Sequence, residues 1–354
     1  MGLRVSGRGI GAWVSSHRWS ALGICAIVIA ISAAVAHFGP RVFYRFFGYL
    51  HLKQVQASLP RDLPRVVASY LGGAELWVVW SSSRSGNHEI YLRKLPSMET
   101  YRLTDDPHVD YYPRFSPDGR RVLFARSRRK WVSQRDELPW DCYIVELDSG
   151  RERLVAEWAN FPMWVDEGRV SFVRRRQEIV LKEIDTGTEH VLLKGGDWPG
   201  SAIATFEILR TRPWMVAING DGAFAGVNTL NLRTRRRMHF GSGCQIFWFP
   251  DGKKVYWVEA RGRGGTRVMC SPAEKIAPRV LLDMPGEFSH EYFPRVSADG
   301  KWMVLGASTG GHEHDIADYE IFLWRVGSPP SSALRITFSP ANDRWPDLYL
   351  PSSR

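Results

Sequence analysis

The sequence contains little cysteine, and none of it is in a paired spacing. Its four cysteines are far apart in the 354-residue chain, at positions 25, 142, 244 and 270. No Cys-x-x-Cys pair occurs, so the pattern gives neither a disulfide framework nor a cysteine-ligated zinc site. We interpret the cysteines as small hydrophobic residues that are buried in the fold.

The common motifs of nucleotide binding are also absent. The chain has no Walker loop and no Gly-x-Gly-x-x-Gly fingerprint. A glycine-rich stretch at 262–265 lies in a hairpin connection and not between a strand and a helix, which is typical of a turn. The sequence therefore predicts a fold more clearly than a reaction.

The composition is that of a large folded protein with an excess of basic residues. The chain is 44% hydrophobic and 12% aromatic, enough for a large core, and its net charge is +10. Its densest basic runs, 174–176 and 235–237, each lie near a predicted turn. Because such short runs usually form solvated hairpin ends, we expect no nucleic-acid partner.

A long apolar run lies near the N-terminus, at residues 19–38. It is long enough to cross a hydrocarbon core as a helix. The basic leader before it, 1–18, should stay in the cytoplasm, so that the rest of the chain is exported. We therefore predict a transmembrane signal-anchor helix at 19–38 in a bacterial inner membrane, with the C-terminal part in the periplasm.

A cleaved signal peptide is the alternative interpretation of this segment. Ala34-Val35-Ala36 matches an Ala-x-Ala site, and cleavage near Ala36 would release a secreted protein. The apolar run is long for a signal peptide, and apolar residues continue one helical face beyond it, at positions 43, 46, 47 and 50. We favour an uncleaved anchor that is followed by a juxtamembrane helix and linker at 39–74.

A pattern of strand, Asp-Gly turn and strand recurs in the rest of the chain. Its copies span residues 112–125, 246–257 and 292–305. Their Asp-Gly pairs begin at Asp118, Asp251 and Asp299. A hairpin turn of this kind needs residues with positive φ, so we interpret these aspartates as turn residues and not as catalytic groups.

The spacing of the copies predicts the number of repeats. Prolines that open successive copies, such as Pro113 and Pro162, are separated by one period of about 50 residues, which is typical of a β-propeller blade. Six such units fit the chain, at 75–105, 110–157, 160–197, 202–241, 243–285 and 290–338. The first unit lacks an opening strand, and 343–350 resembles one. We predict an all-β fold: a six-bladed β-propeller over 75–350, closed by strand 343–350 and preceded by the transmembrane helix.

The repeat resembles that of the TolB-type β-propeller family. The resemblance is carried by Tyr-Pro-Arg-Phe-Ser-Pro-Asp-Gly at 112–119 and by an Asn-x-x-Ile-Tyr strand at 87–91. It implies a TolB-like (WD40-like, PD40-repeat) propeller. TolB itself has an α/β domain before its propeller, and only a short linker is expected here, so a Tol-specific role is not implied. The same repeat also caps peptidases of the prolyl-oligopeptidase type, and no hydrolase domain is expected after the last strand.

A polar connection in the last repeat is the candidate metal site. It brings four possible ligands close together in the sequence, namely His312, His314, Asp315 and Asp318. Imidazole and carboxylate groups are ligands for divalent metals, and alternate residues of an extended segment point the same way. The alternative is a polar loop in which Asp318 caps a turn. We therefore predict a possible divalent metal and no other cofactor.

The connection at 127–139 is the candidate interaction surface. It is basic and contains a tryptophan, and the residues singled out are Arg129, Trp131 and Arg135. Residues that precede the first strands of the repeats, including His290, Glu291 and Asp110, are also placed to line a central pocket.

The favoured function is binding. A rigid disc with loops on both faces suits a scaffold or adaptor for another envelope protein or for a cell-envelope polymer. The alternative is a metal-dependent hydrolase or lyase that acts on an envelope or carbohydrate substrate. An enzyme is the less favoured of the two.

Overall fold

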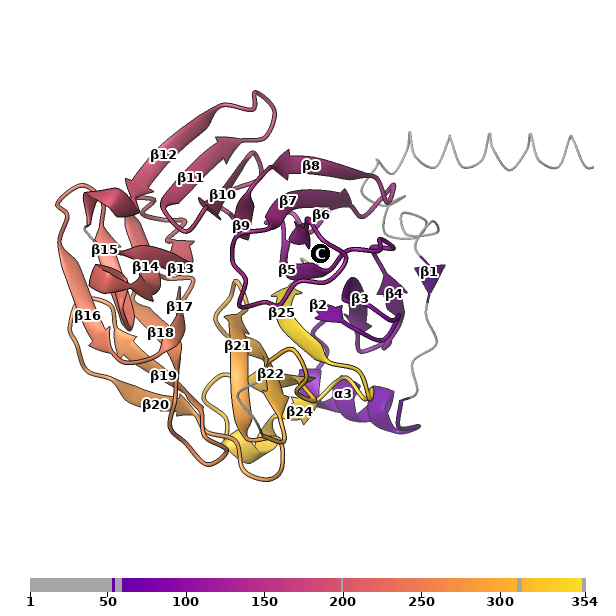
Figure 1. Ribbon diagram of the computed structural model, residues 1–354. Helices are drawn as coiled ribbons and strands as arrows, with labels where there is room; N and C mark the ends of the chain where they lie inside the picture. The colour runs from indigo at the N-terminus through magenta and orange to yellow at the C-terminus, as the bar shows by residue number, and fades with distance from the viewer. Residues whose placement is uncertain (1–52, 55–58, 199, 311–313, 352–354) are drawn as a thin grey trace, which may run out of the picture. The chain divides into compact units, whose positions relative to one another are not determined.

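The computed structural model describes residues 53–54, 59–198, 200–310 and 314–351. Six antiparallel sheets are arranged around a common axis (Figure 1). The predicted six-bladed β-propeller is confirmed, and the predicted helix at 19–38 lies outside the described residues.

Blades 2 to 6 follow one another along the chain, each with four strands in sequence order. Blade 2 has β5 (Asp110–Phe115), β6 (Arg121–Ser127), β7 (Trp140–Glu146) and β8 (Glu152–Ala156). Blade 3 has β9 (Ala159–Trp164), β10 (Arg169–Arg174), β11 (Glu178–Glu183) and β12 (Glu189–Lys194). Blade 4 has β13 (Ala202–Ile208), β14 (Met215–Asp221), β15 (Val227–Asn231) and β16 (Arg237–Gly241). Blade 5 has β17 (Cys244–Trp248), β18 (Lys254–Glu259), β19 (Arg267–Pro272) and β20 (Arg279–Leu282). Blade 6 has β21 (His290–Val296), β22 (Trp302–Ser308), β23 (Glu320–Arg325) and β24 (Leu334–Arg335).

Blade 1 is built from both ends of the propeller sequence. It consists of β25 (Asp343–Tyr349), β2 (Leu76–Ser82), β3 (Glu89–Leu95), β4 (Thr100–Arg102) and β1 (Lys53–Gln54). β25 pairs antiparallel with β2, from Trp77 opposite Tyr349 to Ser82 opposite Asp343. An ion pair of 2.6 Å between Arg84 and Asp343 lies at the same join. Because the strands pair across it, the ring has no free sheet edge at this point.

The Asp-Gly pairs form the turns between the first and second strands. Asp118 accepts hydrogen bonds from the Ser116 hydroxyl (2.5 Å) and the Arg120 amide (3.1 Å). The glycine after it has a φ of +70°, a conformation that glycine adopts without strain. Asp299 makes the equivalent bond with Ser297, at 2.6 Å. The interpretation of these aspartates as turn residues is therefore confirmed.

Buried glutamates join the third and fourth strands in blades 1 and 6. Glu89, in β3, accepts hydrogen bonds from the hydroxyl of Thr104 (2.5 Å) and from Arg102 (2.9 Å). Glu320, in β23, has the same two kinds of donor at equivalent places, Thr337 and Arg335. These two carboxylates therefore link the third strand of each blade to the residues in and just after the fourth strand.

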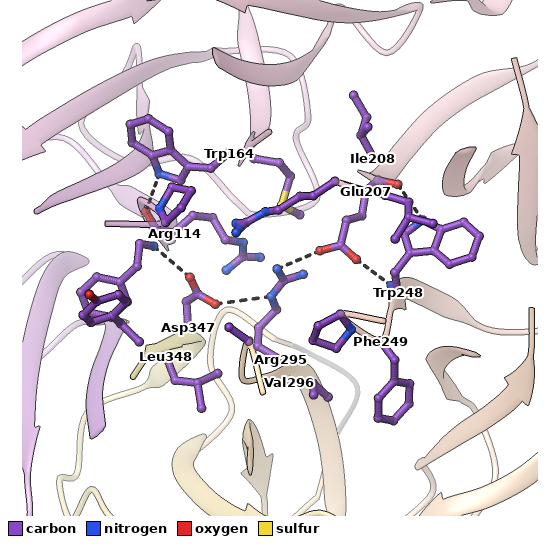
Figure 2. Close-up of a pocket in the computed structure, with 18 of the residues that line it drawn as sticks. Arg114, Trp164, Glu207, Ile208, Trp248, Phe249, Arg295, Val296, Asp347 and Leu348 are labelled. Atoms are coloured by element: carbon purple, nitrogen blue, oxygen red, sulfur yellow. Dashed lines mark hydrogen bonds and ion pairs between the residues drawn. The ribbon is translucent and has the colours of Figure 1, made fainter. Parts of the chain in front are cut away.

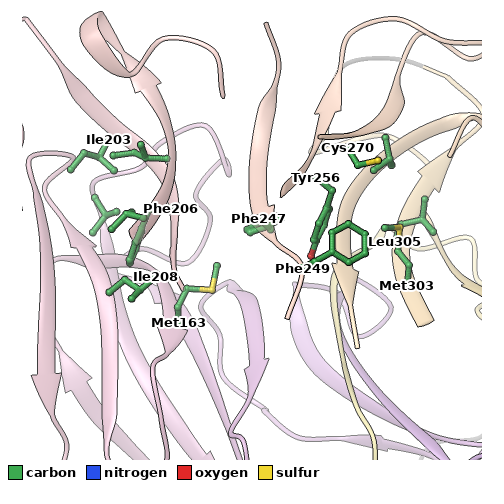
Figure 3. Packing of buried hydrophobic residues seen from close by; sticks show 14 of the residues in the cluster. Met163, Ile203, Phe206, Ile208, Phe247, Phe249, Tyr256, Cys270, Met303 and Leu305 are labelled. Carbon is green, nitrogen blue, oxygen red and sulfur yellow. The ribbon is translucent and has the colours of Figure 1, made fainter. Parts of the chain in front are cut away.

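The core lies between neighbouring blades and is largely apolar. Figure 3 shows part of it, where Phe206 and Ile208 of blade 4 lie near Phe247 of blade 5. Cys142 and Cys270 are buried and unbonded to other cysteines, as predicted, whereas Cys244 is half-buried.

A short helix, α3 (Leu63–Leu71), packs on the join between blades 1 and 6. It has nine residues, and its buried face is made by Leu63, Val67 and Leu71. The Tyr70 hydroxyl accepts a hydrogen bond of 3.0 Å from the Arg325 amide in blade 6, and its ring lies 5.8 Å from that of Trp302. Part of the segment predicted as a linker therefore contributes to the core.

The predicted location in a bacterial inner membrane requires a correction. In the part of the chain that the structure describes, no helix has the length and hydrophobicity to cross a bilayer. The helix on which the prediction depended, at 19–38, is outside that part. The single-pass anchor is therefore not supported.

Candidate functional site

A cavity opens at one mouth of the central channel, where the six innermost strands end. Its volume is about 390 Å³, and residues of β5, β9, β13, β17, β21 and β25 line it (Figure 2). Its charged residues are Arg114, Glu207, Arg210, Arg295 and Asp347. Its aromatic residues are Phe115, Trp164, Trp248, Phe249, Tyr256 and Tyr349. A cavity of this size, with both apolar and polar lining, is typical of a small-ligand or peptide site.

The repeat itself directs these charged side chains to the mouth. Arg114, Arg295 and Asp347 are each the first residue to pair with the second strand after a β-bulge. In blades 3 and 5 the same position holds Met163 and Phe247. A bulge re-aims the side chains that follow it, and here it places two arginines, an aspartate, a methionine and a phenylalanine at the same position of five blades.

Arg295 lies at the centre of an ion-pair network. Its guanidinium is 2.9 Å from a carboxylate oxygen of Glu207 and 3.5 Å from one of Asp347. Burial lowers the pKa of Arg295, but the charge of Glu207 and its other acidic neighbours outweighs burial and raises that pKa above its usual value. Each carboxylate also accepts a backbone amide hydrogen, from Trp248 for Glu207 (2.6 Å) and from Phe115 for Asp347 (2.9 Å). The negative charges of the mouth are therefore already compensated.

Arg114 is placed differently from Arg295, although the repeat gives both the same position. Its side chain is buried, with 3% of its surface exposed. One of its terminal nitrogens donates to the carbonyl of Pro113 (2.8 Å), and Nε has no hydrogen-bond partner. Burial, with the nearby charge of Arg295, lowers the pKa of Arg114 to about 10. Within the described residues, Arg114 forms no ion pair.

Two tryptophans fix the wall of the cavity. The indole N–H of Trp164 donates to the Arg114 carbonyl (3.0 Å), and that of Trp248 donates to the Glu207 carbonyl (3.2 Å). Both rings are thereby held by the backbone of a neighbouring blade. Arg210 lies at the rim, where it is exposed.

The opposite end of the channel is filled. Three aromatic side chains pack there. The ring centroid of Trp345 lies 4.3 Å from that of Tyr112 and 4.1 Å from that of Phe293. The loop between β6 and β7 lies against this cluster, because the Gln134 carboxamide accepts hydrogen bonds from Trp345 and from Arg344, each of 3.1 Å. Side chains and a loop therefore occupy this end, whereas the end with Arg114 contains a cavity.

The structure describes three of the four predicted metal ligands, and His312 lies outside it. The carbonyl of His314 accepts a hydrogen bond of 2.6 Å from the fully buried Arg344, and Asp315 lies 3.1 Å from the same guanidinium. Asp318 instead binds the amide and hydroxyl of Thr309, at 3.0 and 2.8 Å. Among the residues with described positions, no group of three His, Cys, Asp or Glu side chains is arranged to hold a metal ion. The metal site stays a prediction.

The predicted interaction residues lie on the loop at the filled end. Trp131 has 71% of its surface exposed, and Arg129 and Arg135 are exposed beside it. The neighbouring Val132 is buried, and Ser133 donates to Asp315 of blade 6. Trp131 therefore projects from a loop that is fixed at its base, and its role as a contact stays a prediction.

The acidic residues predicted before the innermost strands lie at the start of β5 and β21, and they do not line the cavity. Asp110 accepts two hydrogen bonds of 2.8 Å from Arg126 within blade 2, and Glu291 accepts one from the Met284 amide in the connection between blades 5 and 6. Sequence analysis thus missed the charged residues of the mouth. A signal was available, because the residue after the repeat proline is charged in Pro113-Arg114, Pro294-Arg295 and Pro346-Asp347.

Comparison with other sequences does not assign the chain to a family. No family model matches the chain. A stretch of 98 residues is 24% identical to an uncharacterized protein of Agrobacterium fabrum, and the match covers 26% of this chain and 33% of that protein. The chain thus spans about a third of the length of the curated relative that it matches.

Comparison with solved structures supports the fold. A putative TolB from Agrobacterium tumefaciens superposes with a TM-score of 0.55, at 13% identity, over 77% of this chain and 98% of that one. TolB from Acinetobacter baumannii superposes with a TM-score of 0.47, at 15% identity, over 74% of this chain and 69% of that one. An oligogalacturonate lyase in complex with manganese superposes with a TM-score of 0.45, at 17% identity, over 75% of this chain and 74% of that one. Identities this low show a fold and not a function. The predicted TolB-like propeller is confirmed as a fold.

Proposed function

We propose that this propeller is a binding scaffold that holds a segment of another protein in the mouth at Arg114. The observation that carries the proposal is the difference between the two ends of the channel. One end is filled by aromatic side chains and a loop, and the other contains a cavity of about 390 Å³ that all six blades line. Rigid walls with a few oriented polar groups are typical of a preformed binding site. An envelope protein or cell-envelope polymer is the predicted class of partner.

A variant that fills the mouth tests this proposal. Ala298 is an exposed, small residue on the rim of the cavity, and Ala298→Trp should obstruct it without touching the core. The matched control is Arg263→Trp, which adds the same ring at an exposed position in the connection between β18 and β19. We expect affinity purification from the producing cells to recover partners with the wild type and the control but not with Ala298→Trp. Recovery of the same partners with all three proteins would contradict the proposal.

The predicted alternative is a metal-dependent hydrolase or lyase. Asp315 and the backbone carbonyl of His314 contact the Arg344 guanidinium, so a metal at this site would have to replace Arg344 as the partner of Asp315. Elemental analysis of the purified protein tests this alternative. A stoichiometric metal that is lost in His312→Ala with His314→Ala would support it, and a metal-free protein that these substitutions do not destabilise would exclude this site.

A further inference from the structure

We propose that Arg114 recognises the carboxylate of an acidic side chain in the bound segment. The inference rests on the proposed function and adds to it the chemistry of the ligand. Four observations lead to it: the burial of Arg114, the lack of a partner for its Nε, the compensation of every carboxylate nearby, and the cavity that Arg114 lines.

A buried arginine without an anion is costly for a fold. Transfer of a charged group from water into the interior is unfavourable unless an opposite charge or hydrogen bonds compensate it. Arg114 has 3% of its surface exposed and one hydrogen bond, to the carbonyl of the preceding residue. Its unsatisfied Nε leaves donor capacity for a ligand.

The neighbouring carboxylates do not form an ion pair with Arg114. Glu207 is 2.9 Å from Arg295 and accepts an amide hydrogen from Trp248. Asp347 also serves Arg295, at 3.5 Å, and accepts an amide hydrogen from Phe115. Figure 2 shows the two carboxylates joined through Arg295 by dashed lines, with Arg114 beside them. The mouth contains three arginines (Arg114, Arg210 and Arg295) and two carboxylates (Glu207 and Asp347). Its net charge is therefore +1 (3 − 2), which favours binding of an anion.

The shape of an arginine side chain is complementary to that of a carboxylate. The guanidinium is a planar fork of donors that matches a carboxylate in a bidentate geometry. Aromatic walls at Trp164, Trp248 and Phe249 would contact the apolar atoms that surround an acidic residue in a peptide. The site therefore suits aspartate or glutamate that is flanked by apolar residues.

Selection from a phage-displayed library of random heptapeptides on the full-length protein provides the probe. The best binder is then synthesised with its acidic residue and with the Glu→Gln or Asp→Asn change, and calorimetry measures both against wild type, Arg114→Met and the control Arg263→Met. We expect the amide to bind wild type and the control about 10- to 100-fold more weakly, as for the loss of a charged hydrogen bond. Against Arg114→Met we expect the two peptides to differ by less than about threefold.

The outcomes separate the inference from the proposed function. Peptides that bind in the mouth without any need for an acidic residue, or an equal loss with all three proteins, would overturn the inference and leave the scaffold proposal intact. Failure to select any peptide would count against the scaffold itself and would overturn the inference with it. Arg114-dependent binding of a uronic-acid trisaccharide in the absence of peptide binding would overturn the assignment to a protein partner. If Arg114→Met does not fold, Ala298→Trp replaces it, and we expect that variant to lose the acidic peptide.

Discussion

At the scale of single residues, one level of the channel contains two arginines that differ in their ion pairing. Arg295 forms ion pairs with Glu207 and Asp347, whereas Arg114 forms none within the described residues. The repeat gives both residues the same position after the bulge, so the difference comes from the residues that the other blades place beside them. We expect the ion-pair network to stabilise the fold, and we propose that the arginine without an ion pair binds a ligand.

Substitution of each arginine by methionine should show this difference. Arg295→Met leaves two nearby carboxylates without their cation, which should lower the free energy of unfolding by about 2 to 4 kcal/mol, somewhat less than for a fully buried pair. Arg114→Met is the matched control and should cost less than about 1 kcal/mol, because it removes a cation that no carboxylate needs. Urea denaturation measures both. Equal losses would show that the two arginines have the same structural role.

The buried Glu291 makes stability depend on pH. Burial raises its pKa from the usual 4.5 to about 8, and its Oε2 has no hydrogen-bond partner. Between these values the folded state keeps a proton that the unfolded state has lost, so stability falls as the pH rises, by up to about 1.4 kcal/mol per unit. We expect Glu291→Gln to reduce this fall between pH 5 and 8, as measured by urea denaturation; Asp110 and Glu137, whose pKa values burial raises to about 7, account for the rest. The exposed Glu287→Gln should keep it, and identical pH profiles for the two variants would refute the assignment.

At the scale of elements, α3 links the segment before the propeller to the propeller itself. Val67 is fully buried against blades 1 and 6, whereas its neighbour Val66 has 40% of its surface exposed. Its buried residues belong to the same apolar cluster as Leu348 of β25. The helix therefore packs in the same part of the core as the closing strand.

The two valines offer a matched test of this helix. Val67→Asp places an unpaired charge in the core and should cost about 3 kcal/mol or more, while Val66→Asp should change stability by less than about 0.5 kcal/mol. Urea denaturation of the two variants checks the difference. A small effect at both positions would mean that α3 contributes little to the core.

The elements also show how far the sequence predicts the structure. Asp118 and Asp299 were assigned to turns from the local Asp-Gly pattern, because hairpin geometry is determined within a few residues. The role of Arg114 was missed, since it depends on Glu207 and Asp347, which are distant in sequence. The ligand prediction at His314 and Asp315 considered only neighbours in the chain, and Arg344 approaches both from another blade.

At the scale of the whole molecule, the strand that closes the ring contributes both to the stability of the fold and to the lining of the cavity. β25 supplies the innermost strand of blade 1 and also carries Asp347 to the mouth. Its antiparallel pairing with β2 spans Trp77 to Ser82. The cavity therefore exists only when the last strand is in place.

Removal of the closing strand should abolish cooperative folding. A chain that ends at Asn342 leaves the inner edge of β2 unpaired and loses the buried side chains of β25, including Arg344 and Trp345. We expect a broad, non-cooperative thermal transition by circular dichroism, and we expect an added peptide of residues 341–351 to restore a sharp one by strand addition. A truncated chain that melts like the full one would contradict the role given to β25.

Site-specific photo-crosslinking tests the binding account most directly. A benzoylphenylalanine at position 298 lies on the rim of the cavity, and the same group at position 263 lies in the connection between β18 and β19. We predict that mass spectrometry finds one partner segment attached at 298, with an acidic residue in it, and no such segment at 263. Crosslinks from 263 with none from 298 would show that the partner does not enter the mouth.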